Sequence, residues 1–137
     1  MDTETLKQSL RFLYEGRQAE HPNTYSTDLV FSDPLVLVQN QARVEEMFRK
    51  LNKIFPATEI ASFEASPNET STWLMQVHYK KTPTSRPKVF KSRVNIEFND
   101  GLISRITEHW QKPLKLSGDG RSVLSRGVRS GLGRLFC

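Results

Sequence analysis

The chain has 137 residues, 36% hydrophobic and 26% charged, which is typical of one soluble globular domain. No apolar run approaches the roughly 20 residues of a membrane-spanning helix, which excludes a helical membrane protein. The net charge of +5 would indicate an anionic partner if the fold itself carried it. Residues 112–137 account for the whole excess, through Lys112, Lys115, Arg121, Arg126, Arg129 and Arg134 against Asp119.

The sequence offers little to hold a metal or cofactor. Its three histidines, His21, His78 and His109, lie far apart, and Cys137 is the only cysteine. We therefore expect no metal site and no internal disulfide. The sequence contains neither a phosphate-binding loop nor a nucleophile motif, so we expect no cofactor. The polar, acidic start MDTETLKQSLRF is unlike a secretory signal, so we expect a reducing, cytoplasmic location.

Two helices are predicted in the first half of the chain. The first covers residues 3–17, is capped by Asp2 or Thr3, and has an apolar face formed by Leu6, Leu10, Leu13 and Tyr14. The second lies in NQARVEEMFRKLNKIFP, between its cap Asn40 and Pro56, with a buried stripe formed by Val44, Met47, Phe48, Leu51, Ile54 and Phe55.

Strands are predicted between and after these helices. Residues 28–38 indicate one or two short strands around Asp33-Pro34, because proline cannot donate to a central ladder. After the second helix, EIASFEAS, STWLMQVHYKK, KVFKSRVNIEFN and LISRITEHW read as strands separated by PNE, PTSRP and NDG. Two helices followed by an antiparallel run predict an α+β domain with its helices on one face of a sheet.

The domain is expected to cover residues 1–114, followed by a basic Gly/Arg-rich tail over residues 115–137. Leu124, Val128 and Leu132 in the tail have helical spacing, which leaves open a weak basic amphipathic helix for a membrane surface or a partner groove. Contact with nucleic acid is a further alternative. The tail's glycines favour a plain flexible extension instead.

Two stretches, STDLVFSDP and FNDGLISRITEHW, carry a family resemblance. Together with the order of the elements, they resemble the nuclear transport factor 2-like superfamily, the cone-shaped α+β fold of ketosteroid isomerase, limonene-epoxide hydrolase and SnoaL-like polyketide cyclases. The similarity runs from about Leu6 to Pro113. It implies a curved, cystatin-like sheet wrapped around the N-terminal helices and a pocket for a small, largely apolar ligand. It also implies a homodimer formed through the outer sheet face.

The resemblance also implies site residues. Asp33 falls at the position of the isomerase's general base. The isomerase's two hydrogen-bond donors fall on Ser9 and Val94, neither of which can act in that way, although Tyr14 lies one and a half turns further along the same helix. Ordinary steroid isomerisation is therefore not expected.

The polar residues of the epoxide hydrolase pocket give a second comparison. These positions correspond to Phe31 and Asp33, to Gln76 and His78, and to Glu108. The arginine that lies between two aspartates in the epoxide hydrolase therefore has no counterpart in this sequence. The candidate catalytic residues are accordingly Asp33, His78 and Glu108, with ligand contacts expected from Tyr14, Phe31, Gln76, Val94 and Trp110. This arrangement requires Gln76 and His78 to face the pocket together with Leu74, and Trp73, Met75 and Val77 to face away.

A histidine beside carboxylates suits acid-base chemistry near neutral pH. The alternative is that Asp33 only caps its own turn and His78 lies at the sheet rim. Two functions therefore remain open. One is a SnoaL-like pocket protein, an isomerase, cyclase or hydrolase using Asp33. The other is a non-catalytic module that docks proteins through the sheet face or the tail. Whether the chain is an enzyme at all is left undecided by the sequence.

Overall fold

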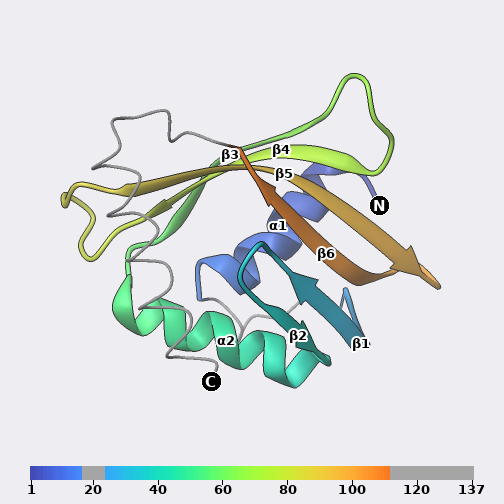
Figure 1. The fold of residues 1–137 in the computed structure, drawn as a ribbon, viewed down its shortest axis with the longest axis horizontal. Helices are drawn as coiled ribbons and strands as arrows, with labels where there is room; N and C mark the ends of the chain where they lie inside the picture. The colour runs from blue at the N-terminus through green and yellow to red at the C-terminus, as the bar shows by residue number, and fades with distance from the viewer. Residues whose placement is uncertain (17–23, 112–137) are drawn as a thin grey trace.

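The computed structural model describes residues 1–16 and 24–111, so the predicted tail and its boundary lie outside the described residues. Two helices and one six-stranded sheet make up the described part (Figure 1). In chain order the elements are α1 (Thr3–Tyr14), β1 (Tyr25–Ser32), β2 (Leu37–Gln39), α2 (Gln41–Ile54), β3 (Glu59–Ala65), β4 (Thr72–Tyr79), β5 (Lys88–Asn99) and β6 (Leu102–Trp110). The predicted α+β class is confirmed.

Both helices begin where the sequence predicts a cap. The Asp2 carboxylate accepts a hydrogen bond from the Thr5 backbone nitrogen at 2.7 Å, and the Asn40 side chain accepts one from Arg43 at 3.0 Å. Each side chain satisfies an amide that the helix itself leaves unpaired. α1 ends at Tyr14, earlier than predicted. In α2 the buried stripe consists of Val44, Met47, Phe48 and Leu51, whereas Ile54 and Phe55 are only partly buried.

The sheet has the order β2-β1-β6-β5-β4-β3, with β1 and β6 parallel and every other pair antiparallel. The predicted NDG turn joins β5 to β6, with Asp100 and Gly101 both at positive φ (53° and 78°), as a two-residue hairpin loop requires. The segment around Asp33-Pro34 is a second turn, between β1 and β2. Because β6 returns to pair with β1, the turn that contains Asp33 lies beside the last strand.

The helices lie on one side of this sheet, with α1 beneath the long strands β4, β5 and β6 (Figure 1). Side chains on that inner face form the core, among them Met75, Val77, Val94, Ile96 and Ile106. The outer face carries the alternate residues of the same strands. Because directly paired strand residues point the same way, the printed registers assign each strand residue to one of the two faces.

Candidate functional site

Glu108 is a buried carboxylate on the inner face of β6. It lies directly opposite Val94 of β5 and is 6% exposed. The Tyr14 hydroxyl of α1 donates a hydrogen bond to its Oε2, and the Trp110 indole nitrogen donates to its Oε1 at 2.9 Å. A buried carboxylate is costly unless its oxygens are bonded. Here each oxygen has a neutral donor, and in the described part of the chain neither has a cation.

This environment holds Glu108 close to the midpoint of its titration. The pKa of Glu108 is raised from 4.5 to about 7. Burial is the largest cause and the charge of Asp33 adds to it, while the hydrogen bonds from Tyr14 and Trp110 act in the opposite direction. Loss of hydration disfavours the charged form of a carboxyl group. Near neutral pH the group is therefore available both as proton donor and as proton acceptor, which is the state that general acid-base chemistry uses.

Asp33 supplies the second carboxylate. Its Oδ1 accepts hydrogen bonds from the backbone nitrogens of Leu35 and Val36 at 2.8 and 2.9 Å, so it caps the β1–β2 turn. Burial raises the pKa of Asp33, although these two bonds lower it. Ser32 pairs with Thr107, so the next position in the parallel ladder puts Asp33 beside Glu108. Asp33 thus holds its turn together and also places a charge at the site.

Tyr14 reaches Glu108 because the end of α1 is fixed against α2. The Asn52 side-chain nitrogen donates to the Tyr14 backbone oxygen at 2.9 Å. The Tyr14 ring packs on Phe48 with 4.5 Å between ring centroids. Burial, followed by the charge of Glu108, raises the pKa of the Tyr14 phenol well above its usual value. Tyr14 therefore remains a neutral hydrogen-bond donor over the physiological pH range.

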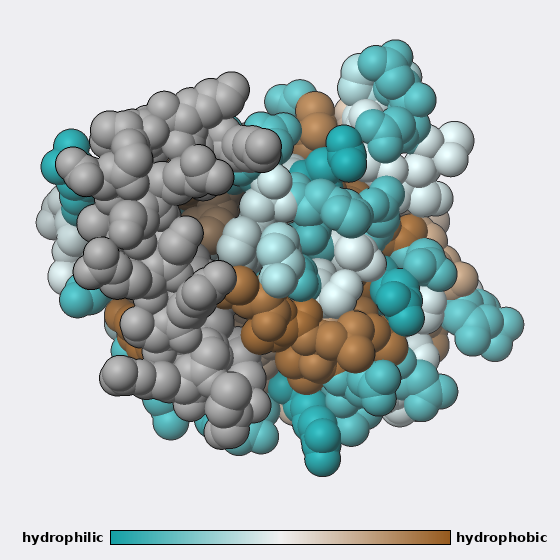
Figure 2. All heavy atoms as spheres, viewed as in Figure 1, coloured by the Kyte–Doolittle hydropathy of each residue, from teal (hydrophilic) through white to brown (hydrophobic). Residues whose placement is uncertain are grey.

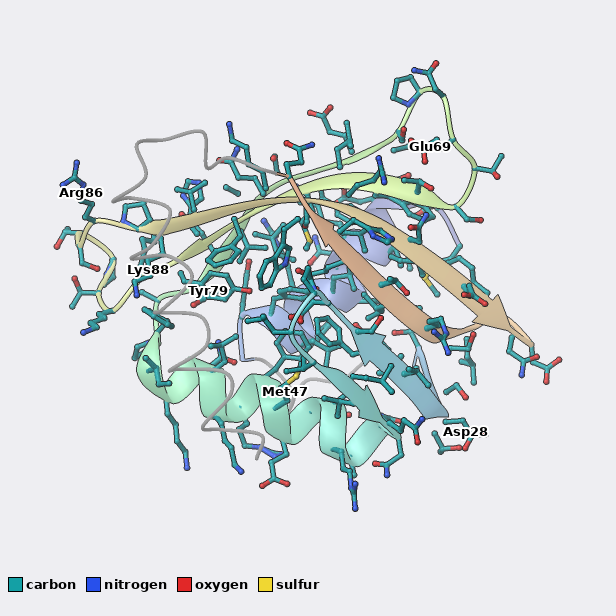
Figure 3. All side chains as sticks on the ribbon, in the orientation of Figure 1. Asp28, Met47, Glu69, Tyr79, Arg86 and Lys88 are labelled. Carbon is teal, nitrogen blue, oxygen red and sulfur yellow. The ribbon has the colours of Figure 1, made fainter. Side chains whose placement is uncertain are left out.

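An aromatic row lines the inner face beside the carboxylates. Phe55, Tyr79, Phe90 and Trp110 follow one another in edge-to-face contacts, with ring centroids 5.8, 5.3 and 5.1 Å apart. Figure 3 shows Tyr79 on the side of the sheet that faces α2, from which Met47 points upward. Burial and the charges of Glu108 and Asp33 raise the pKa of Tyr79 well above its usual value. From the sequence only Trp110 was expected in this wall.

The prediction that Gln76 and His78 share the face of Glu108 is wrong. Gln76 pairs with Lys91 and His78 with Val89 on the outer face. The His78 Nε2 lies 2.7 Å from the Gln76 side-chain oxygen, so the two polar groups bond to each other. The inner positions belong instead to Trp73, Met75 and Val77, which were expected to face away. Packing of their larger apolar area against the helices decided the orientation of the strand.

The other predicted site residues lie on the inner face. Phe31 packs edge-to-face against Phe48 with 5.3 Å between centroids, and Val94 is fully buried. Ser9 is also buried, but its hydroxyl donates to the Thr5 backbone oxygen and accepts from Thr24. Tyr14, rather than Ser9, is therefore the residue of α1 that meets the carboxylate.

Ser92 was missed by the sequence analysis. It is 2% exposed, lies on the inner face between Met75 and Trp110, and its hydroxyl has no hydrogen-bond partner among the described residues. The signal was present in KSRVNIEFN, where Ser92 shares the alternation of the buried Val94 and Ile96. A serine that alternates with buried apolar residues along a strand is expected to point into the protein interior.

Residues 1–16 and 24–111 contain no group of three or more histidine, cysteine, aspartate or glutamate side chains placed to hold a metal ion. None of their helices is both long and apolar enough to cross a membrane.

No protein-family model matches this chain, and no curated protein matches it in sequence. Solved structures do match. A candidate isomerase of the SnoaL-like family from Agrobacterium tumefaciens is 13% identical with a TM-score of 0.58, over 80% of this chain and 97% of that one. A candidate polyketide cyclase from Xanthomonas campestris is 12% identical with a TM-score of 0.58, over 80% and 90%.

A third match names the fold directly. A nuclear transport factor 2-like protein from Anabaena variabilis is 16% identical with a TM-score of 0.56, over 79% of this chain and 82% of that one. At these identities the likeness concerns the backbone alone. The chain has the nuclear transport factor 2-like, SnoaL-like fold, as its two sequence stretches suggested.

Proposed function

We propose that this protein binds a small, uncharged and largely apolar molecule between its sheet and helices, and acts on it by acid-base chemistry at Glu108. The observation that carries the proposal is the buried Glu108, whose bonding partners among the described residues are the neutral donors Tyr14 and Trp110. A carboxyl group kept near half-protonation in an apolar interior is characteristic of catalytic sites. The fold is shared with SnoaL-like isomerase and cyclase candidates.

The chemistry follows from the two carboxyl groups. Protonated Glu108 can donate to a carbonyl oxygen of the ligand, while the charged form can accept a proton from an acidic C–H or O–H group. Asp33 raises the pKa of Glu108 through its charge and is the candidate second base. Tyr14 stabilises the charged form of Glu108 after proton transfer. The expected reaction is an isomerisation, cyclisation or hydrolysis of a carbonyl compound.

An uncharged ligand is favoured by the charges of the site. Asp33 and Glu108 are both acidic, and no ion pair with a basic side chain is found for either among the described residues. An anionic ligand would meet two like charges in a poorly hydrated interior, which is unfavourable. The aromatic row from Phe55 to Trp110 offers flat contacts for an aromatic or unsaturated molecule.

Two probes of matched size test the proposal. Para-cresol donates a hydrogen bond and should prefer charged Glu108, whereas acetophenone accepts one and should prefer the protonated form. Between about pH 6 and about pH 8.5 the affinity for para-cresol should rise and that for acetophenone should fall, because Glu108 loses its proton over this range. Isothermal titration calorimetry measures both.

Glu108→Gln should remove both pH trends, and it should weaken para-cresol binding about ten-fold because a hydrogen bond to a charged acceptor is replaced by a neutral one. Glu97→Gln, on the exposed face of β5, is the control and should leave both trends in place. If neither probe binds the wild-type protein, or if the trends survive in Glu108→Gln, the proposed function is wrong.

The docking-module alternative has one supporting feature. Figure 2 shows apolar side chains gathered over the β1–β2 region, where Leu35 and Leu37 are 37% and 60% exposed. On the outer sheet face, in contrast, Leu74 lies among polar and charged residues such as Gln76, Lys91 and Arg93. A docking function at the β1–β2 region would not require a half-protonated carboxyl group in the interior, so the pH trends above separate the two functions.

A further inference from the structure

Ser92 presents a buried hydroxyl for which the described part of the chain provides no partner. Its side chain is 2% exposed and makes no hydrogen bond to any described residue. An unpaired buried hydroxyl costs roughly 1–3 kcal/mol. A valine or alanine at position 92 would continue the inward-facing apolar row of Val94 and Ile96 without this cost. The presence of a serine there therefore calls for a physical explanation.

Its position relates it to the acidic site. Ser92 pairs with Trp110, and Val94 pairs with Glu108, so Ser92 and Glu108 are diagonal neighbours on the inner face. Such neighbours have Cα atoms about 7–8 Å apart. Both side chains point toward the helices, and Trp110 lies between them in register while bonding to Glu108. The two groups can thus contact opposite ends of one ring-sized molecule.

We propose that the Ser92 hydroxyl is the second polar contact of the ligand that Glu108 binds. The inference rests on the proposed function and deepens it by defining the ligand class. The ligand is an uncharged aromatic or unsaturated compound with two oxygen functions on opposite sides of a ring-sized apolar body. One oxygen meets Glu108 and Tyr14. The other, a hydroxyl or carbonyl group, meets Ser92.

A matched pair of serines tests whether the hydroxyl is unpaired. Ser92→Ala should raise the melting temperature of the unliganded protein by about 2 °C or more, because it removes an unsatisfied group. Ser9→Ala should lower it, because Ser9 is equally buried but has partners in Thr5 and Thr24. If Ser92→Ala lowers the melting temperature as Ser9→Ala does, the hydroxyl is already satisfied and the inference is overturned.

A matched pair of ligands tests the contact itself. Hydroquinone and para-cresol differ only in a hydroxyl against a methyl group at the far end of the ring. The ratio of their affinities should shift toward para-cresol by about five-fold in Ser92→Ala relative to wild type, the effect of one net hydrogen bond. The affinity for para-cresol alone should stay within about two-fold, because its contact with Glu108 is unchanged.

The outcomes separate the two claims. If para-cresol binds through Glu108 but the hydroquinone ratio is the same in Ser92→Ala, the proposed function stands and the Ser92 contact is refuted. An ordered water satisfying the hydroxyl would give that result. If para-cresol fails to bind the wild-type protein, the proposed function and the inference built on it both fail.

Discussion

The inner and outer faces of the same strands place similar side chains in opposite physical states. On the inner face, Glu108 is 6% exposed, accepts hydrogen bonds from the neutral donors Tyr14 and Trp110, and has a pKa raised to about 7, chiefly by burial. On the outer face, the Glu97 side chain is 67% exposed and lies 3.8 Å from Arg105. Consecutive residues along a strand thus face the helices and the solvent in turn.

Residue type alone is therefore a poor guide to acid-base behaviour in this fold. A histidine is ordinarily the better acid-base candidate near neutral pH, yet His78 faces outward and bonds to Gln76. The glutamate that faces inward acquires the titration range usually associated with histidine. Burial, rather than the identity of the side chain, determines which group titrates near neutral pH.

The largest contrast is expected between truncation of a buried phenylalanine and truncation of an exposed one. Phe48→Ala should destabilise the protein by about 3–5 kcal/mol, because it removes a buried ring that packs on both Tyr14 and Phe31. Phe98→Ala should cost about 0.5 kcal/mol, since this ring is 38% exposed. Urea unfolding measures both values. Equal losses would mean that the space between the sheet and α2 is not the packed core.

A smaller contrast is expected from the pH dependence of stability. The raised pKa means that the folded state holds the Glu108 proton more tightly than the unfolded state. The contribution of Glu108 to stability is therefore greatest below about pH 4.5 and falls, by about 3 kcal/mol in total, as the pH rises through about 7.

Glu108→Gln should remove that slope and leave the variant more stable than wild type at about pH 8, since a neutral amide has no charge to bury. The amide oxygen can still accept from Trp110, and the Tyr14 hydroxyl can accept from the amide nitrogen. Glu97→Gln is the outer-face control and should change stability by about 0.5 kcal/mol or less. A wild-type protein whose slope matches that of Glu108→Gln would contradict the raised pKa.

The smallest effect is expected at the outer face. His78→Asn should change the affinity for para-cresol by less than about two-fold, because the side chain lies across the sheet from Glu108. Calorimetry under the conditions used for Glu108→Gln measures this. A ten-fold loss would move the site to the outer face and restore the histidine predicted from the sequence.

The sequence alone determined the elements and most of the fold. Apolar spacing defined both helices, Asp2 and Asn40 marked where they begin, and alternation with the NDG turn defined the strands. These signals are local, since each depends on residues a few positions apart. Asp33, Tyr14, Glu108 and Trp110 were also named from the sequence, through the family resemblance.

Only the tertiary structure decided which residues meet. Pairing of β1 with β6 brings the Asp33 turn to Glu108, and α1 carries the Tyr14 hydroxyl across 94 positions of sequence to the same carboxylate. The face on which His78 lies depended on which side of β4 packs against the helices, and alternation alone allows either assignment. A shift of one residue along a strand exchanges every inward side chain for an outward one. The packing of the sheet against the helices therefore determined which residues form the candidate site.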